Sequence, residues 1–427
     1  DRFWLFHPTH PFWQVPGAEI GTACSAAMLN GEMIESKNKL RLFPLYAGQS
    51  KERLSYPQSA RWLLSVNGFD DTSLKPKEKN LPSISVGWLG SLGYIQALGN
   101  NLYETLMLNL TLLKDGREYW SENRPCWELE TPRSAERTKI PCPDDPAQLL
   151  TLQSRRLLLH RTEGMVDGYF ALGGDFFSKE NAFAEQMTVW RNAAKKNEPA
   201  VFVPCRHDPA RQFWREFPAV FCQDSGHRPG VVRWTEKLQE QRLGILDSRR
   251  KVHFRIVGVL YATQNHIEDI FSDSLTFQAG LLDELSCKWQ ERIVREINNC
   301  EKAAQCVGYL AQDIAIAAGN KNENVGGSVR AQFYFAVDQP FRLWLQKIDA
   351  NQKNYDEIEL RWQVQARNIA EKLGKQMVME AGNAALKGHR IVVDKGKKTE
   401  RTILYTSPKA YNCFRAKLWE IYPKTEL

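Results

Sequence analysis

The sequence predicts an α+β protein, with a loop-rich body of short strands and helices before Phe277 and a bundle of four helices after it. Before that residue, proline and glycine interrupt each apolar run. After it, apolar residues recur every three or four positions over long stretches, the period of a helix with one buried face. An apolar run of β-strand character, 254–260, leads to this boundary through the polar residues Thr263, Gln264 and Asn265.

The first body is expected to contain short elements joined by long loops. Proline at an early position and spaced apolar residues indicate the first helix, and four leucines on one face indicate the second. Two β-rich runs flank Glu163 and Gly164, the kind of residues that turn a hairpin. The predicted elements are helices at 57–66, 100–113 and 182–194, a hairpin at 153–172 and a strand at 201–203.

The second body is expected to begin directly after a short link from the polar residues at 263–266. Pro340 predicts a kink or a break in its second helix. Ser407 and Pro408 have the residue types of an N-cap and a first helical position, and so predict the start of the fourth helix. The apolar positions mark helices at 277–314, 333–348, 358–377 and 407–421.

Composition limits the classes of function. The net charge is +7, from 57 Lys and Arg against 50 Asp and Glu, which allows nucleic-acid binding without requiring it. The 9 cysteines form no CxxC pair, which favours a reducing, cytoplasmic setting and argues against a zinc ribbon. No apolar run approaches the length of a membrane span. The chain opens without Met on aromatic, proline-rich text, so we expect a further N-terminal segment to precede it.

Two lysine-rich segments have the composition of anion-binding loops. In 67–93, Lys75, Lys77 and Lys79 precede Gly87 and Gly90, and the glycines would allow the backbone to approach a ligand closely. The segment 387–401, between the third and fourth helices, is predicted to be a basic loop or a β-hairpin that could contact phosphates. Both segments are equally compatible with solvated surface loops.

The residues themselves point to no catalytic site and no cofactor. No nucleophile–base pair, paired carboxylates or metal-ligand cluster is evident. The dipeptide His207-Asp208 leaves open a metal-dependent nuclease or phosphohydrolase, although the further ligands that such a metal needs are not apparent nearby. A locally hydrogen-bonded loop histidine is the simpler interpretation. A purely structural scaffold is a third possibility.

Several stretches, in this order, resemble the large (Cse/CasA-type) subunit of type I-E CRISPR Cascade. They include LFHPTHPFWQV at the start, GNNLYETLMLNLTLL and ALGGDFFSKENAFAEQMTVWR, and the resemblance extends over essentially the whole chain. It implies a large mixed α/β domain at 1–275 and a four-helix bundle at 276–427. It also implies a non-catalytic subunit in antiviral defence. The implied partners are crRNA, double-stranded target DNA, the backbone, handle-binding and small subunits, and a helicase-nuclease.

The resemblance assigns roles to particular residues. The family inserts a glutamine at a hairpin tip to open DNA beside the protospacer-adjacent motif (PAM), and the matching residue is Gln264 between Thr263 and Asn265. Thr263 stands where the family has asparagine. The lysine that approaches the PAM minor groove matches Lys195 or Lys196.

The remaining assignments concern phosphates and RNA. The family's glycine-rich loop corresponds to 74–90, which includes Lys75, Lys77, Lys79, Gly87 and Gly90. The loop that binds the 5′ handle of crRNA corresponds to 43–49, with Phe43 and Tyr46 as candidates. Possible contacts of the bundle with R-loop phosphates are Lys395, Lys397 and Lys398.

Overall fold

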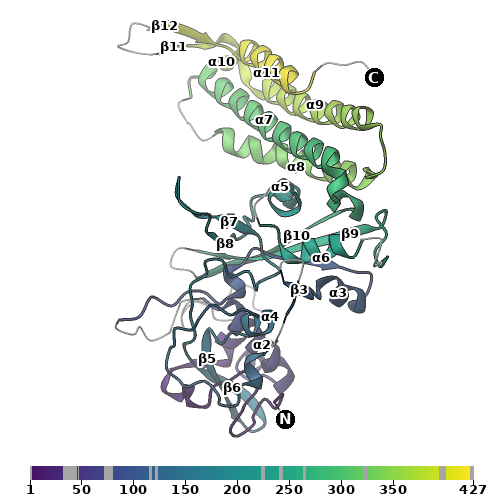
Figure 1. Ribbon diagram of the computed structural model, residues 1–427. Coiled ribbons are helices and arrows are strands. Elements are labelled where there is room, and N and C mark those ends of the chain that lie inside the picture. Colours follow the sequence, from purple (N-terminus) through teal and green to yellow (C-terminus); the bar gives the residue numbers. More distant parts are fainter. Residues whose placement is uncertain are drawn as a thin grey trace. The chain divides into compact units, whose positions relative to one another are not determined.

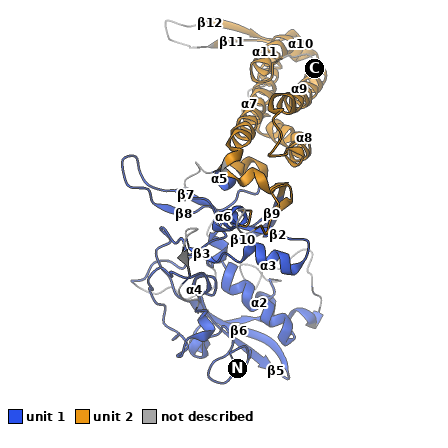
Figure 2. Ribbon diagram, turned by 45° about the vertical axis from the view of Figure 1, so that its right-hand side comes forward, with its two compact units in different colours: residues 1–211, 219–237, 254–274 blue, residues 212–218, 238–253, 275–427 orange. Residues whose placement is uncertain are grey.

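The computed structural model describes residues 2–31, 46, 48–71, 80–114, 118–120, 124–222, 227–239, 244–262, 266–320, 325–393 and 401–423. The chain forms two compact units, coloured separately in Figure 2. Unit 1 comprises residues 1–211, 219–237 and 254–274, and unit 2 comprises 212–218, 238–253 and 275–427. The fold is α+β, with strands and short helices in unit 1 and long helices in unit 2 (Figure 1).

Unit 1 is built from short strands in several small sheets. Two of the sheets have three strands, in the orders β1-β6-β5 and β10-β9-β2. The strands are β1 (Thr22–Ser25), β2 (Tyr94–Leu98), β3 (Leu113–Lys114), β4 (Glu118–Tyr119), β5 (Arg155–Thr162), β6 (Met165–Gly173), β7 (Trp190–Asn192), β8 (Phe202–Pro204), β9 (Lys251–Tyr261) and β10 (Ile267–Gln278). The unit boundary divides β9 and β10, and most residues of both belong to unit 1. The helices are α1 (Ala26–Leu29), α2 (Tyr56–Phe69), α3 (Leu102–Asn109), α4 (Pro146–Leu150), α5 (Phe217–Phe221), which the unit boundary divides, and α6 (Gly230–Lys237).

The β5–β6 hairpin is the predicted hairpin, and local sequence accounts for it. Glu163 and Gly164 both have positive φ, 53° and 78°, as the two central residues of a type I′ turn require. Strand β1 then pairs with the other edge of β6, with Cys24 opposite Tyr169.

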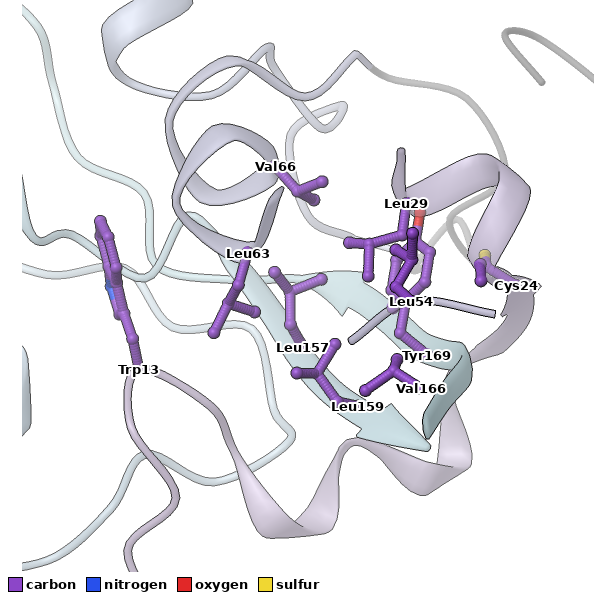
Figure 3. Packing of buried hydrophobic residues seen from close by; sticks show 12 residues of the cluster. Trp13, Cys24, Leu29, Leu54, Leu63, Val66, Leu157, Leu159, Val166 and Tyr169 are labelled. Atoms are coloured by element: carbon purple, nitrogen blue, oxygen red, sulfur yellow. The ribbon is translucent and has the colours of Figure 1, made fainter. Parts of the chain in front are cut away.

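An apolar cluster of unit 1 lies where this sheet meets α1 and α2 (Figure 3). Helix α2 begins with the capping box that Ser55 and Gln58 form, which confirms the helix predicted at 57–66. The fully or nearly buried side chains come from segments far apart in the sequence: Trp13, Leu29, Leu54, Leu63, Val66, Leu157, Leu159, Val166 and Tyr169.

Unit 2 is a four-helix bundle, as predicted, in which α7, α8, α9 and α11 pack against one another. Apolar side chains at helical spacing fill its interior, and Trp344 and Trp362 stack there with ring centroids 5.5 Å apart. Its elements are α7 (Cys287–Ala317), α8 (Val325–Lys347), α9 (Tyr355–Glu380), α10 (Gly382–Lys387), β11 (His389–Val393), β12 (Arg401–Tyr405) and α11 (Ser407–Ile421).

The first helix of the bundle begins later than the predicted residue 277. Phe277 belongs to strand β10, which continues to Gln278, and the first long helix begins at Cys287. Helix α8 continues through Pro340, so no break occurs there. The N-cap of α11 is Thr406, whose hydroxyl accepts a hydrogen bond from the Lys409 amide, one residue before the predicted Ser407.

The helix predicted at 182–194 is wrong. The backbone of this segment is hydrogen-bonded to the β2 region instead of to itself: the Ile95 amide donates to the Met187 carbonyl, and the Val189 amide donates to the Gly93 carbonyl. The half-buried Phe183 ring packs edge to face against the buried Trp190 ring. Tertiary partners therefore override the local helical pattern.

The helix predicted at 100–113 exists but is shorter. Helix α3 ends at Asn109, and the Asn101 side chain caps its start by accepting from the Glu104 amide. Its leucines do not enter a core, because Leu102 is 73% and Leu106 56% exposed. Within the described part of the chain, no helix is long and apolar enough to cross a membrane.

Candidate nucleic-acid interface

Strands β9 and β10 form a hairpin that joins the polar residues 263–265 to unit 1. The last described contact on the way to the tip is a hydrogen bond of 2.8 Å from the Ala262 amide to the His266 carbonyl. Thr263, Gln264 and Asn265 themselves lie outside the described residues. The structure therefore fixes the two strand ends that flank residues 263–265, around Tyr261 and His266. We call these strand ends the hairpin base.

Two side chains at the base attach the hairpin to the rest of unit 1. The Tyr261 hydroxyl donates to the carbonyl of Phe69 at the end of α2, at 2.6 Å. The guanidinium of Arg206 lies over the Tyr261 ring, 4.8 Å from its centroid. Burial raises the pKa of Tyr261 well above any ordinary working pH, so this hydroxyl keeps its proton. The sequence offered no pattern that marks Tyr261 or Arg206.

The structure gives the two candidate glycines an internal role. A side chain at Gly90 would place its Cβ 1.9 Å from the Tyr261 hydroxyl, and one at Gly87 would place it 2.3 Å from the Gly68 carbonyl. Both glycines are buried. The close backbone approach that the sequence predicted is thus made to the protein's own chain, and Gly90 supports the hairpin base. Lys75, Lys77 and Lys79 lie outside the described residues.

The candidate lysines Lys195 and Lys196 are in the loop between β7 and β8, where both are exposed. Both strands of this hairpin pack against the His227 ring, whose centroid lies 5.8 Å from that of Trp190 in β7 and 6.0 Å from that of Phe202 in β8. Two cations at the end of a firmly held hairpin can reach an extended anionic ligand such as nucleic acid.

The other candidates are only partly described. Tyr46 is half-buried, whereas Phe43 and the lysines Lys395, Lys397 and Lys398 lie outside the described residues. The basic segment between α10 and α11 is a β-hairpin, one of the two predicted forms, with antiparallel pairing from His389–Tyr405 to Val393–Arg401. Described residues of this segment that expose positive side chains are Lys387, Arg390 and Arg401.

His207 does not behave as a metal ligand. Its ring is half-buried, Nε2 lies 3.3 Å from the Tyr94 carbonyl, and desolvation lowers its pKa to about 4. The Asp208 carboxylate accepts a hydrogen bond from the Ala210 amide. No group of three His, Cys, Asp or Glu residues in the described ranges could hold a metal ion. The described structure therefore favours a locally hydrogen-bonded histidine over a hydrolase that uses these two residues.

A cationic side chain that the sequence did not single out lies near the hairpin base. The Lys179 ammonium donates to the Ser91 hydroxyl at 2.7 Å and to the Ser85 hydroxyl at 3.2 Å. Burial lowers the pKa of Lys179 to about 8, and the positive charges of Arg206 and Arg155 contribute to the same shift. A lone lysine among aromatic residues gives no sequence signal, and only the fold shows its surroundings.

Comparison with known proteins agrees with this geometry. The family model for the CRISPR-associated protein Cse1 matches residues 1–373. A curated CasA/Cse1 protein of Thermus thermophilus is 26% identical over 334 residues, which are 77% of this chain but 63% of that protein. The chain thus spans less than two thirds of the length of this curated relative.

Solved structures extend the comparison to the bundle. The crystal structure of Thermobifida fusca Cse1 superposes with a TM-score of 0.79 and 30% identity, over 99% of this chain and 80% of that one. A chain of a structure described as a CRISPR RNA-guided surveillance complex superposes with a TM-score of 0.66 over 98% of this chain and 79% of that one. At 16% identity, this second similarity shows the fold alone.

The fold and its matches define a CRISPR-associated protein. More narrowly, the chain belongs to the Cse1 family. This family comprises the large subunits of type I-E Cascade.

Proposed function

We propose that this chain is the subunit of a crRNA-guided Cascade complex that recognises the PAM in double-stranded DNA and starts strand separation with Gln264. The observation that carries the proposal is the β9–β10 hairpin in a chain of the Cse1 family, with residues 263–265 at its turn. The hydrogen bond from Tyr261 to Phe69 supports it, because a side chain that separates stacked bases needs a firm base behind it.

Minor-groove chemistry is consistent with this assignment. Base edges in the minor groove present a degenerate pattern of donors and acceptors, so amide and hydroxyl side chains such as Gln264, Asn265 and Thr263 would read it tolerantly. Lys195 or Lys196 would approach the same groove, and Lys75, Lys77 and Lys79 would contact phosphates, which carry no sequence information. We leave Gly87 and Gly90 out of this interface, because their close contacts are internal.

The bundle is proposed to act after the strands separate. Opening a base step costs roughly 1.4 kcal/mol in lost stacking, so contacts with the displaced strand must stabilise the R-loop. Lys395, Lys397 and Lys398 extend the basic segment to which exposed Arg390 and Arg401 belong. The bundle would also recruit the helicase-nuclease, and Phe43 and Tyr46 would contact the crRNA handle.

The decisive experiment uses the assembled complex with a Gln264→Ala chain. The rate of R-loop formation on a PAM-containing duplex can be measured by the permanganate reactivity of unpaired thymines. It should fall on the order of tenfold, about the effect of one lost base step. Assembly with crRNA, measured by size-exclusion chromatography, should not change.

A duplex with two mismatched base pairs beside the PAM provides the control. Because these bases are already unpaired, the Gln264→Ala complex should open this target as fast as the unchanged complex. Equal R-loop rates for both complexes on the fully paired duplex would refute the role of Gln264.

A further inference from the structure

Unit 1 contains a cavity of about 170 Å³ beside the segment 82–88. Its wall is apolar on one side, where the rings of Trp88 and Phe177 lie with centroids 5.0 Å apart. Its polar lining includes Ser85, Arg137 and Lys179. An apolar wall beside cations is typical of a site that holds an anion out of bulk water, where electrostatic attraction is stronger.

Lys179 is the unusual member of this lining. Within the described ranges, no carboxylate lies within ion-pair distance of its ammonium group, which contacts only the two serine hydroxyls. A half-buried ammonium group without a counter-ion carries a desolvation cost that no described charge offsets. Ser91 already donates its own hydroxyl proton to the Gly87 carbonyl, whereas Ser85 lines the cavity next to Lys179.

The one acidic lining residue would not repel an anion strongly. The Asp175 carboxylate is bound by Arg156 at 2.5 Å and by Arg133 at 3.1 Å. The Arg155 guanidinium, also in the lining, binds Asp70 at 2.8 Å. These pairs neutralise one another and leave Lys179 as the cation that determines the sign of the cavity.

We propose that this cavity is a phosphate-binding site, in which Lys179 and the Ser85 hydroxyl hold the phosphate oxygens. A phosphate group supplies the negative charge that Lys179 lacks and the acceptor oxygens that a serine hydroxyl can bind. The phosphate could belong to a free anion or to a DNA backbone. The second source rests on the proposed function, and the two are separated by experiment.

The first test titrates the purified chain with inorganic phosphate in a calorimeter, at constant ionic strength. Saturable binding is expected, and Lys179→Met should weaken it on the order of tenfold or more, the usual loss when a hydrogen bond to a charged group is removed. Lys114→Met, which changes an exposed lysine elsewhere in unit 1, is the matched control and should bind normally.

Two further measurements distinguish the loss of an anion-binding site from a loss of binding that is caused by unfolding. Sulfate, which keeps its charge over the range, should bind more weakly as the pH rises through about 8, because Lys179 then loses its proton. Ser85→Ala keeps the lysine and should weaken binding by a smaller factor, with the unfolding temperature unchanged. Loss of binding only in variants that also unfold would overturn the assignment.

The second test measures duplex DNA affinity of the assembled complex against salt concentration. If the bound phosphate belongs to DNA, Lys179→Met should lower the slope of log affinity against log salt by about one. Unchanged phosphate binding together with an unchanged slope would refute the site. If the unchanged complex does not recognise DNA, the proposed function fails, while the calorimetric result still decides on the cavity.

Discussion

Unit 1 and unit 2 reach a buried core in different ways. In unit 2, apolar residues at helical spacing come from long helices, so neighbouring core residues such as Phe341, Leu345 and Ile348 are also near in sequence. In unit 1, buried cations connect distant segments: the Arg155 side chain donates to the carbonyls of Asp70, Asp71 and Ser85. Unit 2 is organised by the regular spacing of apolar residues along its helices. Unit 1 is organised by individual hydrogen bonds between segments far apart in sequence.

This difference affects where function can be placed. An irregular backbone must have its hydrogen bonds satisfied by side chains, and Arg155 and Arg156 do this for the segments around the cavity. The same segments carry Gly90 and Lys179 to the hairpin base. Loops held by a rigid scaffold commonly carry binding residues, which agrees with the site proposed in unit 1.

The largest expected effect is in the bundle. Trp362 is 1% exposed and packs against both Trp344 and Phe341. Trp362→Ala should therefore destabilise unit 2 by about 3–5 kcal/mol, from lost burial and the cavity left behind. Hydrogen exchange measured by mass spectrometry should rise in peptides of α7 and α9. Similar protection in both proteins would show that the bundle does not depend on this ring cluster.

A smaller effect is expected in unit 1. Gly90→Ala would push Tyr261 away and break its hydrogen bond to Phe69, at a cost of about 1–3 kcal/mol. The variant should unfold at lower urea concentration and should also slow R-loop formation, since the hairpin base moves.

Gly327→Ala serves as the matched control for this glycine. Gly327 lies in α8, and none of the described neighbours comes within 4 Å of the position that an alanine Cβ would occupy. Alanine should therefore leave the bundle unchanged or stabilise it by up to about 1 kcal/mol. A Gly90→Ala protein as stable as this control would show that unit 1 tolerates movement at the hairpin base.

An effect that depends on pH is expected at Glu296, a buried residue of α7 that lies next to Glu359 of α9. Burial is the main cause that raises its pKa to about 8, and the Glu359 carboxylate adds to it. Arg295 donates a hydrogen bond to the Glu359 carboxylate at 2.8 Å. With its raised pKa, Glu296 holds a proton at neutral pH. Gln363 donates to Oε1 of Glu296, also at 2.8 Å.

The folded chain therefore holds a proton that the unfolded chain releases above about pH 4.5. Stability from Glu296 is fully present below that pH and should decline by up to ~1 kcal/mol per pH unit until the pH passes about 8. Glu296→Gln should flatten this slope with little change at pH 5, because an amide can donate to Glu359. Urea denaturation at several pH values would measure it, and parallel slopes for both proteins would contradict the assignment.

Secondary-structure elements that depend on neighbouring residues can be predicted from the sequence. The 3.6-residue period identified all of the bundle helices, and two turn residues, Glu163 and Gly164, identified the β5–β6 hairpin. The family resemblance added what the residues alone did not show, namely the Cse1 identity. The choice of Gln264 from that resemblance is still a prediction.

Features that depend on contacts between residues far apart in sequence become visible only in the folded structure. Segment 182–194 has a helical pattern, yet its backbone pairs with the β2 region, and the leucines of α3 remain exposed despite their regular spacing. The sequence suggests a ligand-binding role for Gly90, but in the fold Tyr261, from a distant part of the chain, lies against it. Lys179 had no sequence signal, because its burial, its two serine partners and the nearby arginines exist only after the chain has folded.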